Sequence, residues 1–203
     1  MGQRLTIDVK KDNEVVAALY FHWSAYTVSA VMTAQSIVEY LNDEDSDTKD
    51  LELVLRLIRF VEENGGGIDG GEGSEEWEYI TAKYPNVTFK RDDINRNHGL
   101  IAISPNGIEG IHSWSEGEIV IDLDAETISD SVFFIYEDID ELNEERQEWM
   151  DDDYEPISMD DIPELDYDPG ECSFEDLPDF VANLEGNNNC YARYGDIIYG
   201  FIQ

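Results

Sequence analysis

Hydrophobic and polar positions alternate with a period of two at the start of the chain and then change to a helical period. Residues 5–9 alternate, and residues 15–21 form an apolar run rich in β-branched and aromatic side chains. Together these segments predict an N-terminal hairpin. Apolar residues then recur at helical spacing over 27–41 and 51–61, which predicts two helices separated by an acidic turn at 43–47.

Capping signals give the expected ends of these helices. Asp47 or Thr48 is the expected N-cap of the second helix, and the glycine run at 65–67 is expected to end it and to begin a flexible connection. A shorter helix is expected over 75–83, and Pro85 should stop it.

In the middle of the chain the period returns to two. Short apolar stretches at 100–103, 110–114, 118–122 and 131–136 predict four strands separated by turn signals. We expect these strands to form an antiparallel meander, because no crossover helix separates them. Residues 1–136 are therefore expected to form an α+β core, in which one antiparallel sheet, made of the hairpin and the meander, is covered by two or three helices.

Residues 137–203 differ from this core in charge. The stretch 137–185 contains 21 acidic residues and one basic residue, Arg146. Apolar and aromatic side chains nevertheless recur through it, and the segment is expected to close with a helix near 173–184 and a hairpin near 191–202. We therefore predict an acidic, partly helical segment that packs on the core.

The composition excludes several classes of function. The 203-residue chain carries 48 acidic and 12 basic residues, for a formal net charge of −36, and 11% of its residues are aromatic. This aromatic content is atypical of a disordered acidic tail. The charge disfavours direct binding to DNA, RNA or an anionic membrane, because neutralising phosphates requires Lys and Arg. The sequence also has no apolar run of the ~18–20 residues that a membrane span needs.

The N-terminus has no basic segment followed by an apolar one, so no signal peptide is expected. We therefore predict a cytoplasmic protein in which Cys172 and Cys190 are free thiols.

Sequence patterns of known catalytic or metal sites are missing. The glycine-rich run 65–70 resembles a dinucleotide loop, but it follows a helix and carries an acid that would repel a pyrophosphate. The acidic run that starts at Asp43 lacks the glycine and the final glutamate of a calcium loop. The histidines His22, His98 and His112 have no partner at a recognised spacing. We therefore predict a non-enzymatic protein without metal or cofactor, in which His22 is packed and hydrogen-bonded.

Two short motifs frame the predicted N-terminal hairpin. Met-Gly-x-Arg occupies positions 1–4, and Tyr-Phe-His-Trp-Ser-Ala-Tyr occupies positions 20–26. These motifs resemble a group of small phage-encoded proteins of unknown function, which open with Met-Gly-x-Arg and carry Tyr-x-His-Trp-Asp-Gly-Tyr-Pro at the same place. This chain departs from them at Ser24, Ala25 and Thr27. The resemblance implies a phage origin, and hence the cytoplasm of a host cell, but it implies no activity.

The acidic stretch carries the functional hypothesis. If residues 137–153 form one helix, its 17 residues span ~26 Å. The helix then carries one net negative charge per ~2.8 Å of its length. This spacing lies between the phosphate spacings of ~3.4 Å in a single strand and ~1.7 Å in a duplex. An ordered surface of this density can imitate a phosphate backbone, and aromatic side chains can anchor a partner. The expected partner-binding residues are Glu137, Asp138, Glu141, Glu144, Glu145, Glu148, Trp149, Asp151, Asp152 and Asp153.

These observations lead to the hypothesis of an acidic, phage-type inhibitor. It would occupy the basic surface of a host nucleic-acid-binding defence protein, such as a nuclease, a restriction enzyme or a CRISPR-type effector. In a competing hypothesis, the acids only keep the protein soluble, and it binds an oligomerisation or regulatory surface of a defence protein without mimicry. Two further hypotheses are a small hydrolase that uses His22 and a structural component of a phage. The sequence identifies no partner and leaves a homodimer open.

Overall fold

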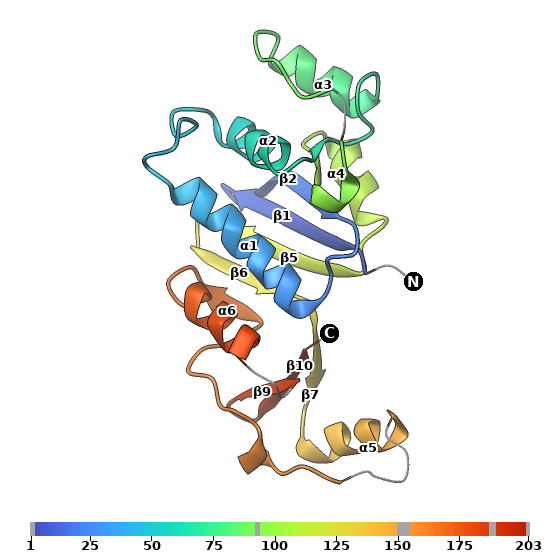
Figure 1. Cartoon of the computed structure of the whole chain (residues 1–203), viewed down its shortest axis with the longest axis vertical. Coiled ribbons are helices and arrows are strands. Elements are labelled where there is room, and N and C mark those ends of the chain that lie inside the picture. Colours follow the sequence, from blue (N-terminus) through green and yellow to red (C-terminus); the bar gives the residue numbers. More distant parts are fainter. Residues whose placement is uncertain (1–2, 92–93, 150–154, 187–189, 202–203) are drawn as a thin grey trace.

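The backbone forms two sheets of different size with helices around them (Figure 1). The computed structural model describes residues 3–91, 94–149, 155–186 and 190–201, and the statements below concern these residues. Within them the fold is α+β, with a seven-stranded mixed sheet, a three-stranded antiparallel sheet and six α-helices. Short 3-10 helices lie at Arg96–His98 and Met159–Asp161.

The N-terminal hairpin lies at the centre of the large sheet. Strand β1 (Leu5–Lys11) pairs antiparallel with β2 (Glu14–Phe21) and parallel with β5 (Gly117–Asp122). The order of the strands is β3-β4-β2-β1-β5-β6-β8. The other strands are β3 (Gly67–Ile68), β4 (Leu100–Ala102), β6 (Thr127–Asp130) and β8 (Glu171–Ser173).

Alternation along the strands directs side chains to the two faces of the large sheet. Ile7 and Leu19 are fully buried in the main core, which α1 (Thr27–Asn42) and α2 (Leu53–Glu63) cover. Ala18 and Tyr20 point to the opposite face and pack against Ile111 of α4, which spans Pro105–His112. The main core therefore lies between the sheet and α1 and α2, while α4 lies on the other face.

Helix α3 (Glu75–Lys83) holds the start of α4 through a buried carboxylate. Glu76 is 5% exposed, and its Oε1 accepts hydrogen bonds from the backbone N–H groups of Ile103 (2.6 Å) and Ser104 (3.1 Å). These bonds satisfy donors next to the N-terminus of α4, where a negative charge is favourable. The position of α4 is therefore set by α3 as well as by the sheet.

The small sheet follows directly from the large one. Its strands are β7 (Phe133–Tyr136), β10 (Ile197–Phe201) and β9 (Tyr191–Tyr194), with β10 in the middle. Figure 1 shows this sheet at the lower end of the molecule, next to α5 (Ile139–Trp149), whereas α6 (Leu177–Gly186) lies between it and α1. The segment 137–203 thus adds β8 to the large sheet, beside β6, and both β10 and β9 to the small sheet, with β10 beside β7.

Aromatic side chains connect the two sheets. The ring centroid of Phe133 lies 6.0 Å from that of Phe180 in α6, 5.7 Å from Tyr199 and 5.8 Å from Phe201. All four residues belong to the same buried cluster as the core of the large sheet. One hydrophobic core therefore continues from the large sheet into the small one.

Several sequence predictions are confirmed. The α+β class and the N-terminal hairpin are as expected, and the helices predicted at 27–41, 51–61 and 75–83 correspond to α1, α2 and α3. The closing hairpin predicted at 191–202 corresponds to β9 and β10. In each of these segments the period of the hydrophobic residues was sufficient to predict the helix or the hairpin.

The prediction of one antiparallel sheet covered by two or three helices is wrong in part. The β1–β5 and β3–β4 pairs are parallel, so the large sheet is mixed, and the described residues up to 136 contain four helices, α1 to α4. The strand expected at 110–114 lies largely in α4. The side chain of Ser104 accepts the N–H of Gly107, and Pro105 occupies the first turn, so this Pro-Asn-Gly sequence begins a helix and not a hairpin turn.

Two helix starts also differ from expectation. Helix α2 begins after Glu52, and Thr48 is instead hydrogen-bonded to Ser46 within the preceding turn. Helix α6 begins at Leu177, four residues after Ser173, because the Ser173 hydroxyl and Asp176 bond to each other in a turn before the helix.

Replacing Phe180 by alanine tests the aromatic connection. The Phe180 side chain is fully buried, so Phe180→Ala should lower the free energy of unfolding by about 3–5 kcal/mol, through lost contacts and a cavity. Urea unfolding followed by circular dichroism measures this change. Ala182→Ser, at an exposed position of the same helix, should stay within about 0.5 kcal/mol of wild type. Equal losses in the two variants would contradict this role for Phe180.

Candidate functional site

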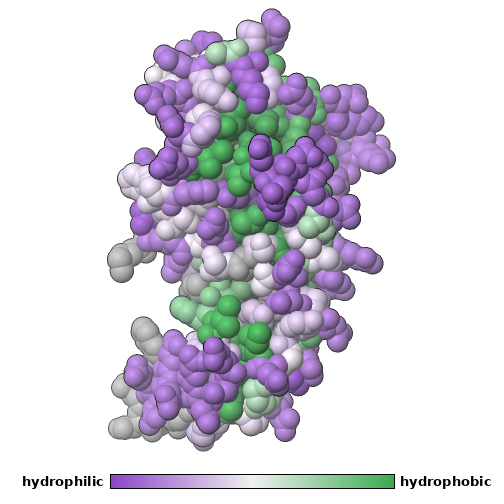
Figure 2. Space-filling model, turned by 180° about the vertical axis from the view of Figure 1, so that it is seen from behind, coloured by the Kyte–Doolittle hydropathy of each residue, from purple (hydrophilic) through white to green (hydrophobic). Residues whose placement is uncertain are grey.

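Helix α5 has an apolar face and an acidic face. Leu142 is fully buried against Tyr136, Ile162 and Ile198, so this side of the helix packs on the small sheet. The exposed residues of α5 and of the two positions before it are mostly acidic: Glu137, Asp138, Asp140, Glu141, Glu144 and Glu148. In Figure 2, seen from behind, hydrophilic side chains cover this end of the molecule at the lower left. We call these six residues the acidic face.

Some residues of the acidic face also form the N-terminal cap of α5. Asp138 Oδ1 accepts the backbone N–H groups of Asp140 and Glu141, each at 2.9 Å. Glu141 Oε2 in turn accepts the N–H of Glu137 at 2.9 Å. Negative charge at a helix N-terminus is stabilising. Asp138 and Glu141 therefore contribute to the fold, whereas Asp140, Glu144 and Glu148 are the members of the face whose side chains make no such bond to the cap.

Glu145 does not belong to the acidic face. It is half-buried and lies near the hydroxyl of Tyr136 in the small sheet. Burial of that hydroxyl, together with the neighbouring Glu145 carboxylate, raises the pKa of Tyr136. Glu145, one of the expected partner-binding residues, is therefore turned toward the small sheet by helical geometry, apart from its exposed neighbours.

The chain after α5 returns to the helix and is held there. Asn143 bonds to the backbone of Ile157 in both directions, with Nδ2 donating at 2.9 Å and Oδ1 accepting at 3.0 Å. Arg146 donates to the carbonyl of Glu155. These bonds fix α5 between the small sheet and the segment that follows it, so the acidic face is presented by an anchored helix.

The charge density of the described helix is lower than the sequence predicts. Helix α5 has 11 residues, which span ~16 Å. It carries five acids and one base, so it has one net negative charge per ~4 Å, which is close to the ~3.4 Å spacing of a single strand and far from that of a duplex. The predicted residues Asp151, Asp152 and Asp153 lie outside the described residues. Trp149 is the last residue of α5.

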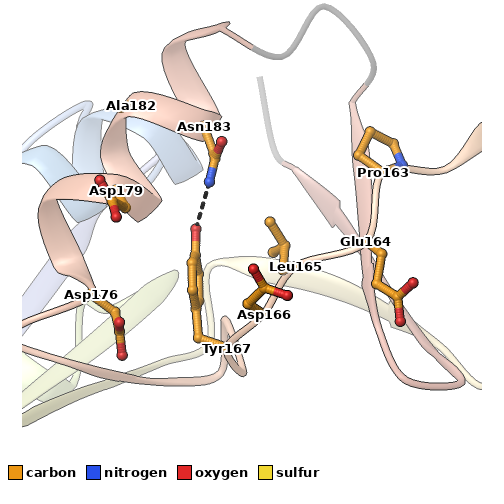
Figure 3. A pocket seen from close by; sticks show the side chains of 9 residues that line it. All are labelled: Pro163, Glu164, Leu165, Asp166, Tyr167, Asp176, Asp179, Ala182 and Asn183. Carbon is orange, nitrogen blue, oxygen red and sulfur yellow. Dashed lines mark hydrogen bonds between the residues drawn. The ribbon is translucent and has the colours of Figure 1, made fainter.

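A second acidic feature was not found from the sequence. A pocket of about 740 Å³ lies between the segment 163–167 and α6 (Figure 3). It is lined by Pro163, Glu164, Leu165, Asp166, Tyr167, Asp176, Asp179, Ala182 and Asn183, and we call it the acidic pocket. No spacing in the sequence predicts this pocket, because its two sides, the segment 163–167 and α6, come together only in the folded chain.

Tyr167 is the centre of the acidic pocket. Its hydroxyl accepts a hydrogen bond from Asn183 Nδ2 at 3.0 Å, and burial raises the pKa of this hydroxyl. Figure 3 shows Asp166 on one side of the ring and Asp176 and Asp179 on the other. An aromatic ring flanked by carboxylates suits the side chain of Arg or Lys, which can pair with the charges and stack on the ring.

The carboxylates of the pocket differ in their partners. Glu164 is paired with Arg193 at 2.7 Å, and Asp176 accepts a hydrogen bond from Ser173 at 2.6 Å. Asp166 and Asp179 are exposed and have no hydrogen-bond or ion-pair partner among the residues that the structure describes. These two are therefore available to an external cation.

An apolar strand edge lies in the same part of the molecule. Phe134 is 51% and Ile135 is 62% exposed, although both lie in β7. In the described part of the chain β7 pairs only with β10, so its other edge is open. Figure 2 shows apolar surface in the lower half of the molecule, next to the hydrophilic end. An open, apolar edge without Lys or Pro is typical of a surface that pairs with another chain.

His22 is packed in the way the sequence predicts. Its Nδ1 lies 2.7 Å from the Tyr20 hydroxyl, and its ring packs edge-on against Trp23 at a centroid distance of 5.1 Å. Within the described residues, none of its hydrogen bonds or ion pairs involves a carboxylate. Trp23 has a φ of 65° and is 52% exposed, which is an unusual backbone conformation for a bulky residue.

Comparison with known proteins identifies no relative. No protein-family model matches the chain, and no curated protein or solved structure was found to be similar to it. The function therefore has to be argued from the surface of this protein alone. No helix in the described segments has the length and apolar character needed to cross a lipid bilayer.

The acidic face should cost stability through repulsion. Changing Glu144 and Glu148 to Gln together should raise the melting temperature at low ionic strength, because a chain of net charge −36 repels itself and neither residue lies in the first turn of α5. The difference from wild type should shrink as ionic strength rises from ~0.01 M to ~0.15 M, where the Debye length falls from ~30 Å to ~8 Å. Differential scanning calorimetry measures both effects.

The matched control neutralises carboxylates that have a basic partner. Asp122→Asn and Asp124→Asn remove the ion pairs with Lys10 and Lys11, so they should lower the melting temperature although they change the net charge in the same direction. If both sets of substitutions move the melting temperature in the same direction, total charge alone accounts for the result, and the distinction between paired and unpaired acids is wrong.

Proposed function

We propose that this protein is a non-enzymatic inhibitor that binds the basic surface of a nucleic-acid-binding protein by imitating a phosphate backbone. The N-terminal resemblance to phage proteins suggests a host defence protein as the target, such as a nuclease, a restriction enzyme or a CRISPR-type effector. The observation that carries the proposal is the acidic face, whose carboxylates extend from a helix that is packed on the small sheet.

The anchoring of α5 supports binding over simple solubility. A solubilising charge needs no defined position, whereas mimicry needs charges at a regular spacing on a rigid support. Leu142 and the Asn143–Ile157 bonds provide that support. The spacing of the described charges is closer to a single strand than to a duplex, so a single-strand-binding groove is the better match.

The acidic pocket extends this mechanism. Long-range attraction between the acidic face and a basic surface speeds association, and carboxylates then pair with Lys and Arg of the partner. Asp166 and Asp179 beside Tyr167 would accept one such side chain in a concave site, where it loses more water than on an open surface. Nucleic acid is excluded because its binding residues are occupied.

A second candidate function has its own support in β7. An inhibitor that binds an oligomerisation or regulatory surface would use apolar contact area, and the open edge with Phe134 and Ile135 provides it. In that case the acidic face only keeps the protein soluble. The two functions differ in the effect of salt: salt should weaken binding by mimicry strongly and binding through the β7 edge little.

Charge reversal tests the mimicry directly. The variant with Asp140, Glu144 and Glu148 changed to Lys should lose capture of nucleic-acid-binding proteins from bacterial lysate by at least about a hundredfold, because several charge pairs become repulsive together. Pull-down at low salt with quantitative mass spectrometry measures the loss. For the wild type, excess single-stranded DNA should compete with the captured protein.

The matched control reverses the same number of exposed acids elsewhere. Glu44, Glu78 and Glu109 lie in or near helices of the core, and changing them to Lys should leave capture within about threefold of wild type, since only non-specific attraction changes. Equal capture by the acidic-face variant and the wild type would contradict mimicry.

Substitutions at the β7 edge separate the two candidate functions. If the partner binds this edge, changing Phe134 and Ile135 to Ser should abolish capture, and binding should change little between ~0.1 M and ~0.5 M salt, where exposed charge pairs are screened. If mimicry is correct, the same variant should still capture the partner, and salt should release it. The melting temperature of the variant is the control for folding.

A further inference from the structure

Polar side chains line β1 and β5 on the face opposite α1. Two ion pairs, Arg4–Glu116 and Lys10–Asp122, join the two ends of this strand pair at N–O distances of 2.9 and 2.8 Å. Asp8 lies between them on β1 and is only 3% exposed. In the described part of the chain it has no Lys or Arg partner. A buried carboxyl in this position is stabilised either by a proton or by a nearby positive charge.

His112 and Glu118 complete a cluster around Asp8. His112 Nε2 lies 2.8 Å from Asp8 Oδ1, and one ligand atom of each of the three residues lies within 4.8 Å of the others. Two carboxylates this close repel each other unless a cation or a proton lies between them. Without an ion the His–Asp contact is a hydrogen bond. Tetrahedral ligands bound at ~2.1 Å lie ~3.4 Å apart, so the two groups need to separate by only ~0.6 Å to become neighbouring ligands of one ion.

A buried hydroxyl belongs to the same place. Thr6 precedes Asp8 by two residues, so both side chains leave the same face of β1, and Thr6 is paired in register with Glu118. Thr6 is 0% exposed, and its Oγ1 has no hydrogen-bond partner among the described residues. Buried hydroxyls without a partner are rare and costly, and a cation in the cluster would provide one for the oxygen.

We propose that Asp8, His112 and Glu118 bind one divalent first-row transition-metal ion, such as Zn²⁺ or Mn²⁺, with the Thr6 hydroxyl as a further oxygen donor. A histidine nitrogen with carboxylate oxygens is a ligand set for these ions, whereas Mg²⁺ and Ca²⁺ prefer oxygen alone. The ligands come from β1, from the C-terminal end of α4 and from β5. The ion would therefore tie α4 to the centre of the large sheet, and the site is independent of the acidic face.

Calorimetric titration of the chelator-treated chain tests this site. Zn²⁺ and Mn²⁺ are titrated separately in millimolar Mg²⁺, which occupies weak sites on the many exposed carboxylates. The wild type should bind one ion per chain, with Zn²⁺ tighter than Mn²⁺. His112→Gln and Glu118→Gln should each weaken binding by at least about tenfold. Unchanged affinity in both variants, or no binding above the Mg²⁺ background, would overturn the proposal.

Controls exclude other ligands. His98→Gln and Glu78→Gln change an exposed histidine and an exposed acid outside the cluster, and both should bind as the wild type does. Zn²⁺ binding that is lost in Cys190→Ser instead would place the ion at a thiol and contradict the site. Thr6→Val should weaken binding while keeping or raising the melting temperature of the metal-free chain, because it removes an unpaired buried hydroxyl.

A measurement on the unmodified chain keeps the test valid if the variants fold poorly. The chain has three histidines, so their imidazole signals can be resolved by NMR. Substoichiometric Mn²⁺ should broaden the His112 signals first and those of His22 and His98 later. Equal broadening of all three would indicate non-specific binding and would overturn the site.

Discussion

The arrangement of the C-terminal third depends on one short crossing between the two sheets. β6 ends at Asp130 in the large sheet, and β7 begins at Phe133 in the small one. At the crossing, the Thr27 hydroxyl donates to the carbonyl of Val132, and the ring of Phe133 enters the core between α6 and β10. Losing the hydrogen bond would remove a donor from the carbonyl of the buried Val132, and losing the Phe133 ring would leave a cavity. The crossing therefore holds the small sheet, and with it α5 and the acidic pocket, in a defined position relative to α1.

The carboxylates of the chain fall into two structural groups. Those at the ends of β5 are paired with bases of the N-terminal strand, through Arg4–Glu116, Lys10–Asp122 and Lys11–Asp124. In each pair the basic partner lowers the pKa of the carboxylate, so the pairing favours the folded state above the ordinary carboxyl pKa and is lost as the pH falls through the lowered value. The acidic face belongs to the second group, because α5 has one base for its five acids. The carboxylates of this face that take no part in the cap, at Glu144 and Glu148, oppose folding through repulsion, and the apolar contacts of Leu142 help to offset this.

The hydrophobic period was sufficient to predict the elements whose partners are close in sequence. The N-terminal hairpin, α1, α2, α3 and the last hairpin follow from local pattern alone. The parallel pairing of β1 with β5 could not be predicted in this way, because about 110 residues separate the two strands and nothing local specifies the register. The Asp8–His112 contact and the acidic pocket depend on the same kind of long-range placement. The hairpin turn predicted at Pro105-Asn106-Gly107 was wrong for a different reason. These residues suit a turn and a helix start equally, and the capping by Ser104 and Glu76 favours the helix.

The positions of the unpaired acids favour a binding role. Exposed acids also lie in or near helices of the core, as at Glu44, Glu78 and Glu109, so exposure alone does not separate binding from solubility. The N-terminal strands pair acids with bases where they lie close together. On α5 the chain instead keeps Asp140, Glu144 and Glu148 exposed on a helix that is fixed by a buried leucine and by two bonds from Asn143. Repulsion among these charges is relieved only when cations approach them. These charges destabilise the free protein, and contact with Lys and Arg of a partner removes that destabilisation. The same charges therefore add to the affinity for a basic surface. This is the energetic condition for a mimic of a phosphate backbone.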